Sequence, residues 1–191
     1  MKKLKIGVIG EHPANDAQAI INLLQPYYGE KAQFKICLKN FTGDDLSSPK
    51  FLQELKRSNF HKIYDFIVII RDLDGLPTQT DLLAKKQKLF QEYQEKLNGI
   101  GIFMLNIFEL EALILADLTS FNLRFKTKFV FKSNPAYQNN PKGLLKTKSD
   151  TKYQESDAID LLKNTNITNI RANHSFFDDF CVEFEQKINF S

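Results

Sequence analysis

The feature that most constrains the fold is the run from Tyr64 to Ile70, YDFIVII. Its apolar residues do not alternate with polar ones, a pattern typical of a strand that is covered on both faces, as in parallel sheets. The run stops at the polar, glycine-containing segment RDLDG, residues 71–75. A strand of this kind needs parallel neighbours and helical connections, so it predicts an α/β fold.

Three other short segments rich in β-forming residues predict further strands, at Lys3–Ile9, Gln33–Leu38 and Gly99–Leu105. Segments with helical spacing of apolar residues, or long polar segments between strands, predict helices at 14–24, 51–55, 78–97 and 109–115. Strands and helices therefore alternate along the chain. This order predicts a mainly parallel, Rossmann-like four-stranded sheet flanked by helices, with crossover connections.

The pattern weakens after Leu118. Residues 121–152 are rich in Lys, Asn and Pro without a clear period and predict a large loop or insert. Helical spacing returns at 156–162 and 176–188. We therefore expect an α/β core over residues 1–118. A basic loop and a mostly helical C-terminal extension, residues 119–191, should pack on that core as part of one structural unit.

Composition excludes several classes of protein. The chain has 191 residues, 42% of them hydrophobic, and no run of roughly 18 apolar residues that could span a membrane. The basic start is followed by too few apolar residues for a signal peptide. Cys37 and Cys181 lack CxxC spacing, so we expect free buried thiols in a reducing cytoplasm. Without a P-loop, GxGxxG or HExxH motif, no nucleotide cofactor or zinc site is expected.

Acidic residues follow two of the predicted strands. Glu11 comes after the first strand, and Asp72 and Asp74 come after the third. The two-residue period of a strand predicts that Asp72 and Asp74 point to the same side. Ligands of open parallel sheets bind beyond the carboxyl ends of the strands. Converging carboxylates repel one another unless a cation neutralises them, and hard oxygen ligands favour Mg²⁺ or Mn²⁺.

These acids resemble the signature of the Toprim fold, which topoisomerases, primases and OLD-type nucleases share: a Glu after the first strand and Asp-x-Asp after the third. The chain is most similar to a bacterial Toprim-like family of unknown function. Segments that resemble motifs of this family, in the same order, are Val8–Glu11, Arg71–Gly75, Glu109–Asp117 (ELEALILAD), Asn134–Pro135 or Asn140–Lys142, and Ser175–Phe180 (SFFDDF). The chain departs from the family pattern at His12, where a Gly is usual, at Asp16, one residue later than usual, and at Leu113, where a Trp is usual.

The resemblance implies a Mg²⁺- or Mn²⁺-dependent phosphodiester enzyme that acts on nucleic acid, such as a small nuclease or nuclease subunit in DNA processing or defence. It implies that Glu11, Asp72 and Asp74 are catalytic and hold the metal. Glu111 is either a further metal ligand or a helix N-terminal acid favoured by the helix dipole, and Asp16 has the same two interpretations. Glu109 lies two positions from Glu111 on a predicted helix, so the two cannot both face the site.

Basic residues are concentrated between Leu118 and Lys152, where eight of them stand against one acid, Asp150. With six interleaved aromatic residues, this segment is interpreted either as a nucleic-acid surface that tracks phosphates and stacks on bases, or as a solvated lysine-rich surface. The aromatic residues are Phe121, Phe125, Phe129, Phe131, Tyr137 and Tyr153.

Single basic residues add further candidates. Arg71, Lys142 and Arg171 are the candidate phosphate contacts, although Arg71 has the alternative of pairing with a carboxylate. His12 either takes part in proton transfer or phosphate contact, or has no role at the rim of the site.

Two other functions stay open from the sequence. One is a non-catalytic Toprim-like protein that binds nucleic acid or a partner such as an ATPase. The other is a phospho-receiver-like or nucleotide-binding domain, which is disfavoured because no lysine ends a late strand beside the acids. The sequence leaves open whether the substrate is DNA or RNA and which oligomeric state the chain adopts.

Overall fold

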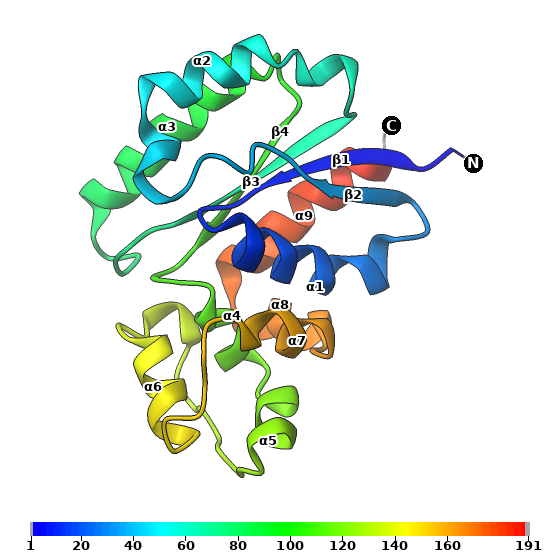
Figure 1. The fold of residues 1–191 in the computed structure, drawn as a ribbon. Coiled ribbons are helices and arrows are strands. Elements are labelled where there is room, and N and C mark those ends of the chain that lie inside the picture. The colour runs from blue at the N-terminus through cyan, green and yellow to red at the C-terminus, as the bar shows by residue number, and fades with distance from the viewer. Residues whose placement is uncertain (1, 190–191) are drawn as a thin grey trace.

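Four parallel strands form the centre of the molecule (Figure 1). The structure is a computed structural model and describes residues 2–189. The strands are β1 (Leu4–Ile9), β2 (Ala32–Ile36), β3 (Phe66–Asp72) and β4 (Gly101–Asn106). They lie in the order β2-β1-β3-β4, and each neighbouring pair is parallel. The predicted α/β fold with a four-stranded parallel sheet flanked by helices is confirmed.

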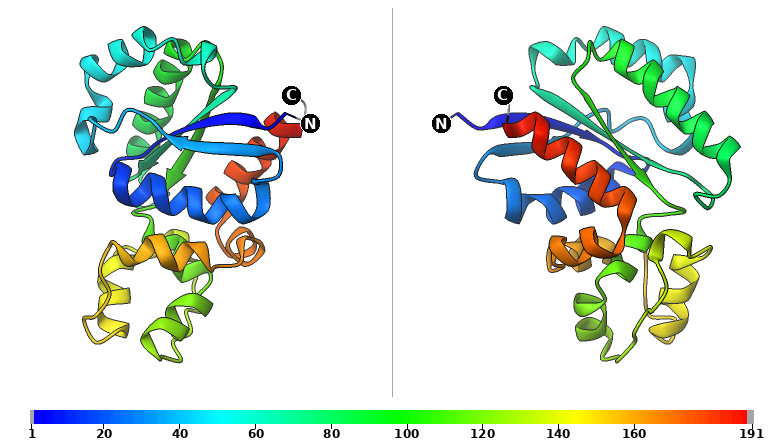
Figure 2. Two further views of the ribbon diagram at one scale, coloured as in Figure 1. Left: turned by 45° about the vertical axis from the view of Figure 1, so that its right-hand side comes forward. Right: turned by 180° about the vertical axis from the view of Figure 1, so that it is seen from behind.

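Helices cover both faces of the sheet (Figures 1 and 2). One layer consists of α1 (Gln18–Tyr28) and α9 (Ser175–Asn189), and the other of α2 (Pro49–Arg57) and α3 (Thr80–Lys96). Val68 and Ile70 of β3 belong to the hydrophobic cluster beneath α1 and α9. Ile67 and Ile69 belong to the cluster on the other face. All four side chains are fully buried, which explains why this strand shows no alternation.

After β4 the chain leaves the sheet and forms a group of short helices, drawn below the sheet in Figure 1. These helices are α4 (Glu111–Ala116), α5 (Thr119–Phe125), α6 (Pro141–Lys148), α7 (Asp157–Lys163) and α8 (Ile167–Asn173). We call residues 111–173 the helical lobe. Next, α9 returns to the sheet and packs against β4.

The prediction of one large loop over residues 121–152 was wrong in part, because α5 ends within this segment and α6 lies in it. The N-terminus of α6 is stabilised locally: the side chain of Asn140 accepts a hydrogen bond from the N–H of Gly143 at 2.8 Å. Pro141 follows at the first helical position, where its missing N–H has no effect on the helix. This capping signal is short and lies within polar sequence, so periodicity alone does not reveal it.

Short turns of helix connect the other elements: η1 (Pro13–Ala17), η2 (Gly43–Ser47), η3 (Phe60–Lys62) and η4 (Pro135–Tyr137). Both cysteines, Cys37 and Cys181, are buried free thiols, as predicted. Within residues 2–189, none of the helices has the length and apolar character that crossing a bilayer requires.

The strand order determines where a ligand can bind. From β1 the chain crosses to β2 on one side, and β3 then pairs with the opposite side of β1. At such a reversal the connections diverge and leave a crevice beyond the carboxyl ends of the two central strands. The residues that follow β1 and the last residue of β3, Asp72, therefore lie at the position where open α/β sheets bind ligands.

Candidate functional site

A pocket of about 370 Å³ lies at this crevice, between the carboxyl ends of β1 and β3 and the helical lobe. Carboxylates dominate its lining. The acidic residues that line it are Glu11, Asp16, Asp72, Glu109, Glu111 and Glu155. The basic residues in the lining are His12 and Lys142. The pocket therefore carries an excess of negative charge, which suits a cationic ligand or a metal ion.

Glu11 is held in place by a buried arginine. Its Oε1 accepts hydrogen bonds from Arg71 Nε at 2.6 Å and from the backbone N–H of Asp72 at 3.0 Å. The Arg71 side chain is only 3% exposed and also donates to the hydroxyls of Ser47 and Tyr93, each at 3.2 Å. The ion pair orients Glu11 toward the end of β3. Arg71 is therefore paired with a carboxylate, which is one of the two roles that the sequence left open for it.

Asp72 lies at the inner wall of the pocket. Its Oδ1 accepts a hydrogen bond from the side-chain amide of Asn106, the residue opposite it on β4, at 2.9 Å. Burial, and then repulsion from Asp16, Glu11 and Asp74, raises the pKa of Asp72 well above its usual value. Asp72 is therefore an acid whose charge is poorly compensated by the protein.

Asp16 approaches Asp72 from the turn that precedes α1. This turn, η1, is a short π-helix, a conformation that often occurs at functional sites. Asp16 Oδ2 accepts the backbone N–H of His12 at 2.8 Å. Burial raises the pKa of Asp16 to about 6, with a further contribution from Glu11. Of the charged groups near Asp72, Asp16 raises its pKa most.

The helical lobe supplies the opposite wall. Lys142 Nζ lies 3.1 Å from both Glu109 Oε2 and Glu155 Oε1, and Glu109 Oε1 accepts the backbone N–H of Lys142 at 3.0 Å. Glu111 is buried deeper, and its Oε1 accepts a hydrogen bond from the Tyr153 hydroxyl at 3.0 Å. Glu109 and Glu111 both line the pocket, so the prediction that only one of them can face the site was wrong. The reason is that α4 begins at Glu111, and Glu109 precedes it in non-helical backbone.

Burial, and then repulsion from Glu109, raises the pKa of Glu111 to about 7. In the unfolded chain Glu111 ionises near its ordinary pKa of 4.5, so its contribution to stability is present below that pH and is lost as the pH rises through about 7. The loss amounts to about 3 kcal/mol. We expect Glu111→Gln, which retains an acceptor for Tyr153, to unfold like the wild type at pH 4 and to be more stable at pH 8.

Denaturant unfolding measured across this pH range checks the expectation. Glu95→Gln, at an exposed position on α3, is the control and should follow the wild-type curve. A Glu111→Gln curve that runs parallel to the wild-type curve from pH 4 to pH 8 would contradict this account of the pocket.

Asp74 does not line the pocket. The strand ends at Asp72, and Asp74 has a φ of +57°, so the two-residue strand period on which its orientation was predicted no longer applies. Its side chain is 71% exposed and lies 3.5 Å from Lys86 Nζ, which is also 4.0 Å from Glu11 Oε1. The structure thus brings Glu11 and Asp72 together, with Asp74 joined to Glu11 through Lys86.

The three basic residues predicted to contact phosphate are all engaged with acids. Arg71 is paired with Glu11, and Lys142 with Glu109 and Glu155. Arg171 lies on α8 and contacts Asp178 and Glu185, each at 2.6 Å. Of the three, only Lys142 lines the pocket. His12 lines the pocket as well and is exposed.

Asn106 is a site residue that the sequence analysis missed, as it also missed Glu155 and Lys86. Asn106 is 1% exposed, and its Oδ1 has no hydrogen-bond partner within residues 2–189. The available signal was its position at the end of the fourth predicted strand, beside the acids of the third. A lone Asn at a strand end is too common to be assigned a role without knowledge of the strand order.

The donor set of the pocket fits Mg²⁺ or Mn²⁺ in its chemistry. Carboxylates with raised pKa values and a buried, unpartnered amide oxygen indicate that positive charge is lacking beside Asp72. Over residues 2–189, no three or more His, Cys, Asp and Glu side chains are already grouped in a way that could hold a metal ion. As they stand, these carboxylates could supply one or two ligands to a cation, with water completing its coordination.

The chain was compared with protein-family models, with curated proteins and with solved structures. None of these three comparisons gives a match. The chemistry of the pocket is therefore the basis for inferring function.

Proposed function

We propose that this chain is a Mg²⁺- or Mn²⁺-dependent phosphodiester enzyme of the Toprim type, acting on nucleic acid as a small nuclease or nuclease subunit in DNA processing or defence. One observation carries the proposal: Glu11 and Asp16, from the connection between β1 and α1, and Asp72, at the end of β3, line one pocket at the point where the strand order reverses. The raised pKa values of Asp16 and Asp72 support it, because perturbed acids in a cleft are typical of functional sites.

Asp72, Glu11 and Asp16 are the residues proposed to hold the metal. Bound there, a divalent cation polarises a phosphoryl oxygen and lowers the pKa of a coordinated water. Arg71 orients Glu11, and Asn106 orients Asp72, through the hydrogen bonds described above. Lys142 compensates part of the negative charge on the lobe side of the pocket. In this proposal Asp74, which is paired with Lys86, and Glu111, which accepts a hydrogen bond from Tyr153, are not metal ligands.

Hydrolysis of DNA and RNA with Mg²⁺ or Mn²⁺, compared between wild type and Asp72→Ala, tests the proposal. We expect metal-dependent cleavage by the wild type and a loss of at least about 10²-fold in the variant, since an electrostatic element of the transition-state site is removed. Arg57→Ala, at an exposed ion pair on α2, is the control and should cleave like the wild type. Equal cleavage by wild type and Asp72→Ala would contradict the proposal.

A second candidate is a non-catalytic subunit that binds nucleic acid or protein, for instance beside an ATPase. The observation that favours it is the neutralisation of two of the predicted catalytic acids by the protein itself, Glu11 by Arg71 and Asp74 by Lys86. Nucleic-acid binding that needs no metal and is unchanged in Asp72→Ala, with no cleavage by the wild type, would identify this function.

A further inference from the structure

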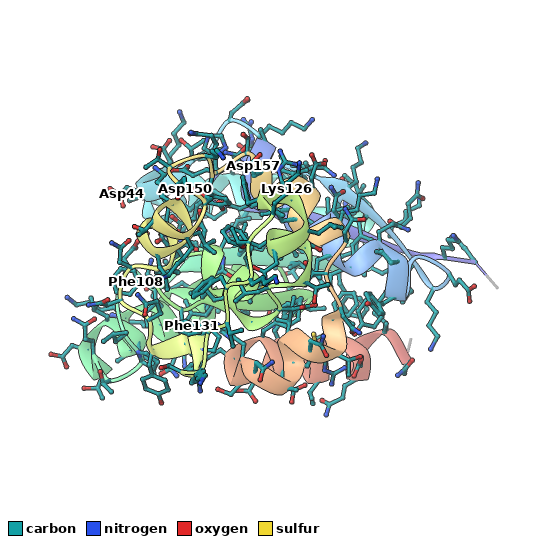
Figure 3. All side chains as sticks on the ribbon, turned by 90° about the horizontal axis from the view of Figure 1, so that it is seen from below. Asp44, Phe108, Lys126, Phe131, Asp150 and Asp157 are labelled. Atoms are coloured by element: carbon teal, nitrogen blue, oxygen red, sulfur yellow. The ribbon has the colours of Figure 1, made fainter. Side chains whose placement is uncertain are left out.

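Helices α5 and α6 end on the side of the helical lobe that is farthest from the sheet (Figure 1), and four exposed lysines lie at these helix ends or follow them closely in the chain. They are Lys126, Lys128, Lys148 and Lys152, and we call them the lysine surface. Lys126 directly follows α5, Lys148 is the last residue of α6, and the other two follow these helices closely. Figure 3 looks onto this end of the molecule, where Lys126 is labelled.

Hydrogen bonds and ring contacts hold the segment that carries Lys128 in a defined position. The side chain of Asn122 accepts the backbone N–H of Phe129 at 3.0 Å and donates to the Phe129 carbonyl at 2.9 Å. Phe129 and Phe131 are half-buried against the main hydrophobic cluster, whereas Lys128 between α5 and Phe129 is exposed. Lys148 Nζ lies 5.3 Å from the centre of the Phe129 ring, which joins the end of α6 to this segment. The ammonium group of Lys148 is thus held over the Phe129 ring, beside the segment that carries Lys128.

These lysines differ from the other basic residues near the pocket. Within the described part of the chain, none of the four forms an ion pair with a carboxylate. Arg71, Lys142 and Arg171, by contrast, are all paired. From residue 126 to residue 152 the sequence has one acid, Asp150. The lysine surface therefore offers a partner positive charge that no carboxylate of the described residues neutralises.

Five of the six aromatic residues of this region are buried or half-buried, so they offer little surface for base stacking. Phe121 and Tyr153 are fully buried, and their rings pack against Phe125. Of the six aromatic residues interleaved with the lysines, Tyr137 is the exposed one. The chemistry of the surface consequently matches phosphate groups rather than bases.

Helix α6 connects the lysine surface to the pocket. Lys142, near its first residue, lines the pocket, and Lys148 ends the helix. Six residues of α-helix span about 9 Å. Each strand of B-DNA carries one charge per 3.4 Å or so of the helix axis, so this span corresponds to roughly two or three phosphates. One strand of nucleic acid is therefore long enough to span from the pocket to the end of α6 that carries Lys148.

We propose that the lysine surface binds the phosphate backbone of nucleic acid without regard to base sequence. This inference rests on the proposed function in one respect, that the substrate is nucleic acid. It does not require the chain to cleave that substrate, and it can therefore be tested in the absence of metal.

The test is the binding of fluorescently labelled single-stranded and double-stranded DNA and RNA in EDTA, over a range of KCl concentrations. We compare wild type with a variant in which all four lysines of the surface are replaced by Gln. The matched control replaces four exposed lysines on the α2 and α3 side of the molecule, Lys56, Lys62, Lys85 and Lys88, and so changes the net charge equally. A third variant, with Arg at the four surface positions, retains the charge.

We expect the Gln variant to lower the slope of log K against log salt concentration by roughly 3 to 4, about 0.9 for each duplex phosphate that the protein no longer neutralises. The Arg variant and the control should bind nearly as the wild type does. Equal loss of binding in the Gln variant and the control would overturn the inference, because net charge would explain it. The inference would also be overturned if the wild type bound none of these nucleic acids. The same holds if, in a parallel assay, it bound phosphatidylserine vesicles but no nucleic acid.

Hydrolysis of bis(p-nitrophenyl) phosphate by the wild type with Mn²⁺ is measured in parallel. Hydrolysis without lysine-dependent binding would overturn the inference about the lysine surface and would still support the proposed catalytic function. Lysine-dependent binding without any hydrolysis would support the inference and count against the proposed function.

Discussion

Asp72→Asn is expected to stabilise the protein while it abolishes metal-dependent activity. The substitution removes a buried charge that Asp16, Glu11 and Asp74 repel, and an Asn side chain still offers Asn106 an acceptor. Because the pKa of Asp72 is raised on folding, its contribution to stability is present at low pH and is lost as the pH rises. The gain in the free energy of unfolding should therefore be largest at neutral and alkaline pH, at about 1–2 kcal/mol.

Denaturant unfolding at pH 4 and pH 8 measures this gain. Asp74→Asn is the matched control, because Asp74 is exposed and, within residues 2–189, forms an ion pair with Lys86 alone. It should change stability by no more than about 0.5 kcal/mol. A destabilised Asp72→Asn at pH 8 would mean that the carboxylates of the pocket are well compensated in the folded protein.

The largest loss of stability is expected for Arg71→Met. The substitution leaves Glu11 without its principal partner, and also removes the donor to Ser47 and Tyr93. Loss of one member of a buried ion pair typically destabilises a protein by about 3–5 kcal/mol, because an uncompensated charge stays behind. Chemical denaturation of the purified variant measures the effect.

Two further variants test whether the uncompensated charge of Glu11 causes the loss of stability. In the double variant Arg71→Met with Glu11→Gln, no carboxylate is left uncompensated, so part of the stability should return. Arg57→Met breaks the Glu54 pair, in which the Arg57 side chain is 82% exposed, and should change stability by less than about 1 kcal/mol. A double variant no more stable than Arg71→Met alone would argue against this explanation.

The sheet was predictable because its signals are local. Residues 64–70 are apolar on both faces of one strand, and this requires a layer of helices on each side whatever the rest of the chain does. The positions of Glu11 and Asp72 followed from the same reasoning, since Asp72 is the last residue of one parallel strand and Glu11 lies two residues after the end of another. The hydrogen bond from the backbone of Asp72 to Glu11 joins those two segments.

The rest of the site depends on structure that the sequence pattern does not specify. The prediction that Asp74 lies beside Asp72 failed because the backbone is left-handed at Asp74, two residues after the end of β3. Such a turn is not apparent from Asp-Leu-Asp-Gly alone. The role of Asn106 depends on the pairing of β4 with β3, and that of Lys86 on the packing of α3 beside the pocket. The acids of the lobe face the pocket because α7 packs against α1, and α4 packs against α6 and α7, an arrangement with little periodic signal.

The central claim is that carboxylates from separate segments bind a divalent cation at the end of β3. The most direct measurement is the anomalous X-ray signal of Mn²⁺ in crystals soaked with this ion. We expect a peak within bonding distance, about 2.2 Å, of Asp72 and of oxygens from Glu11 or Asp16. A peak confined to exposed acids such as Asp74, with none in the pocket, would contradict it.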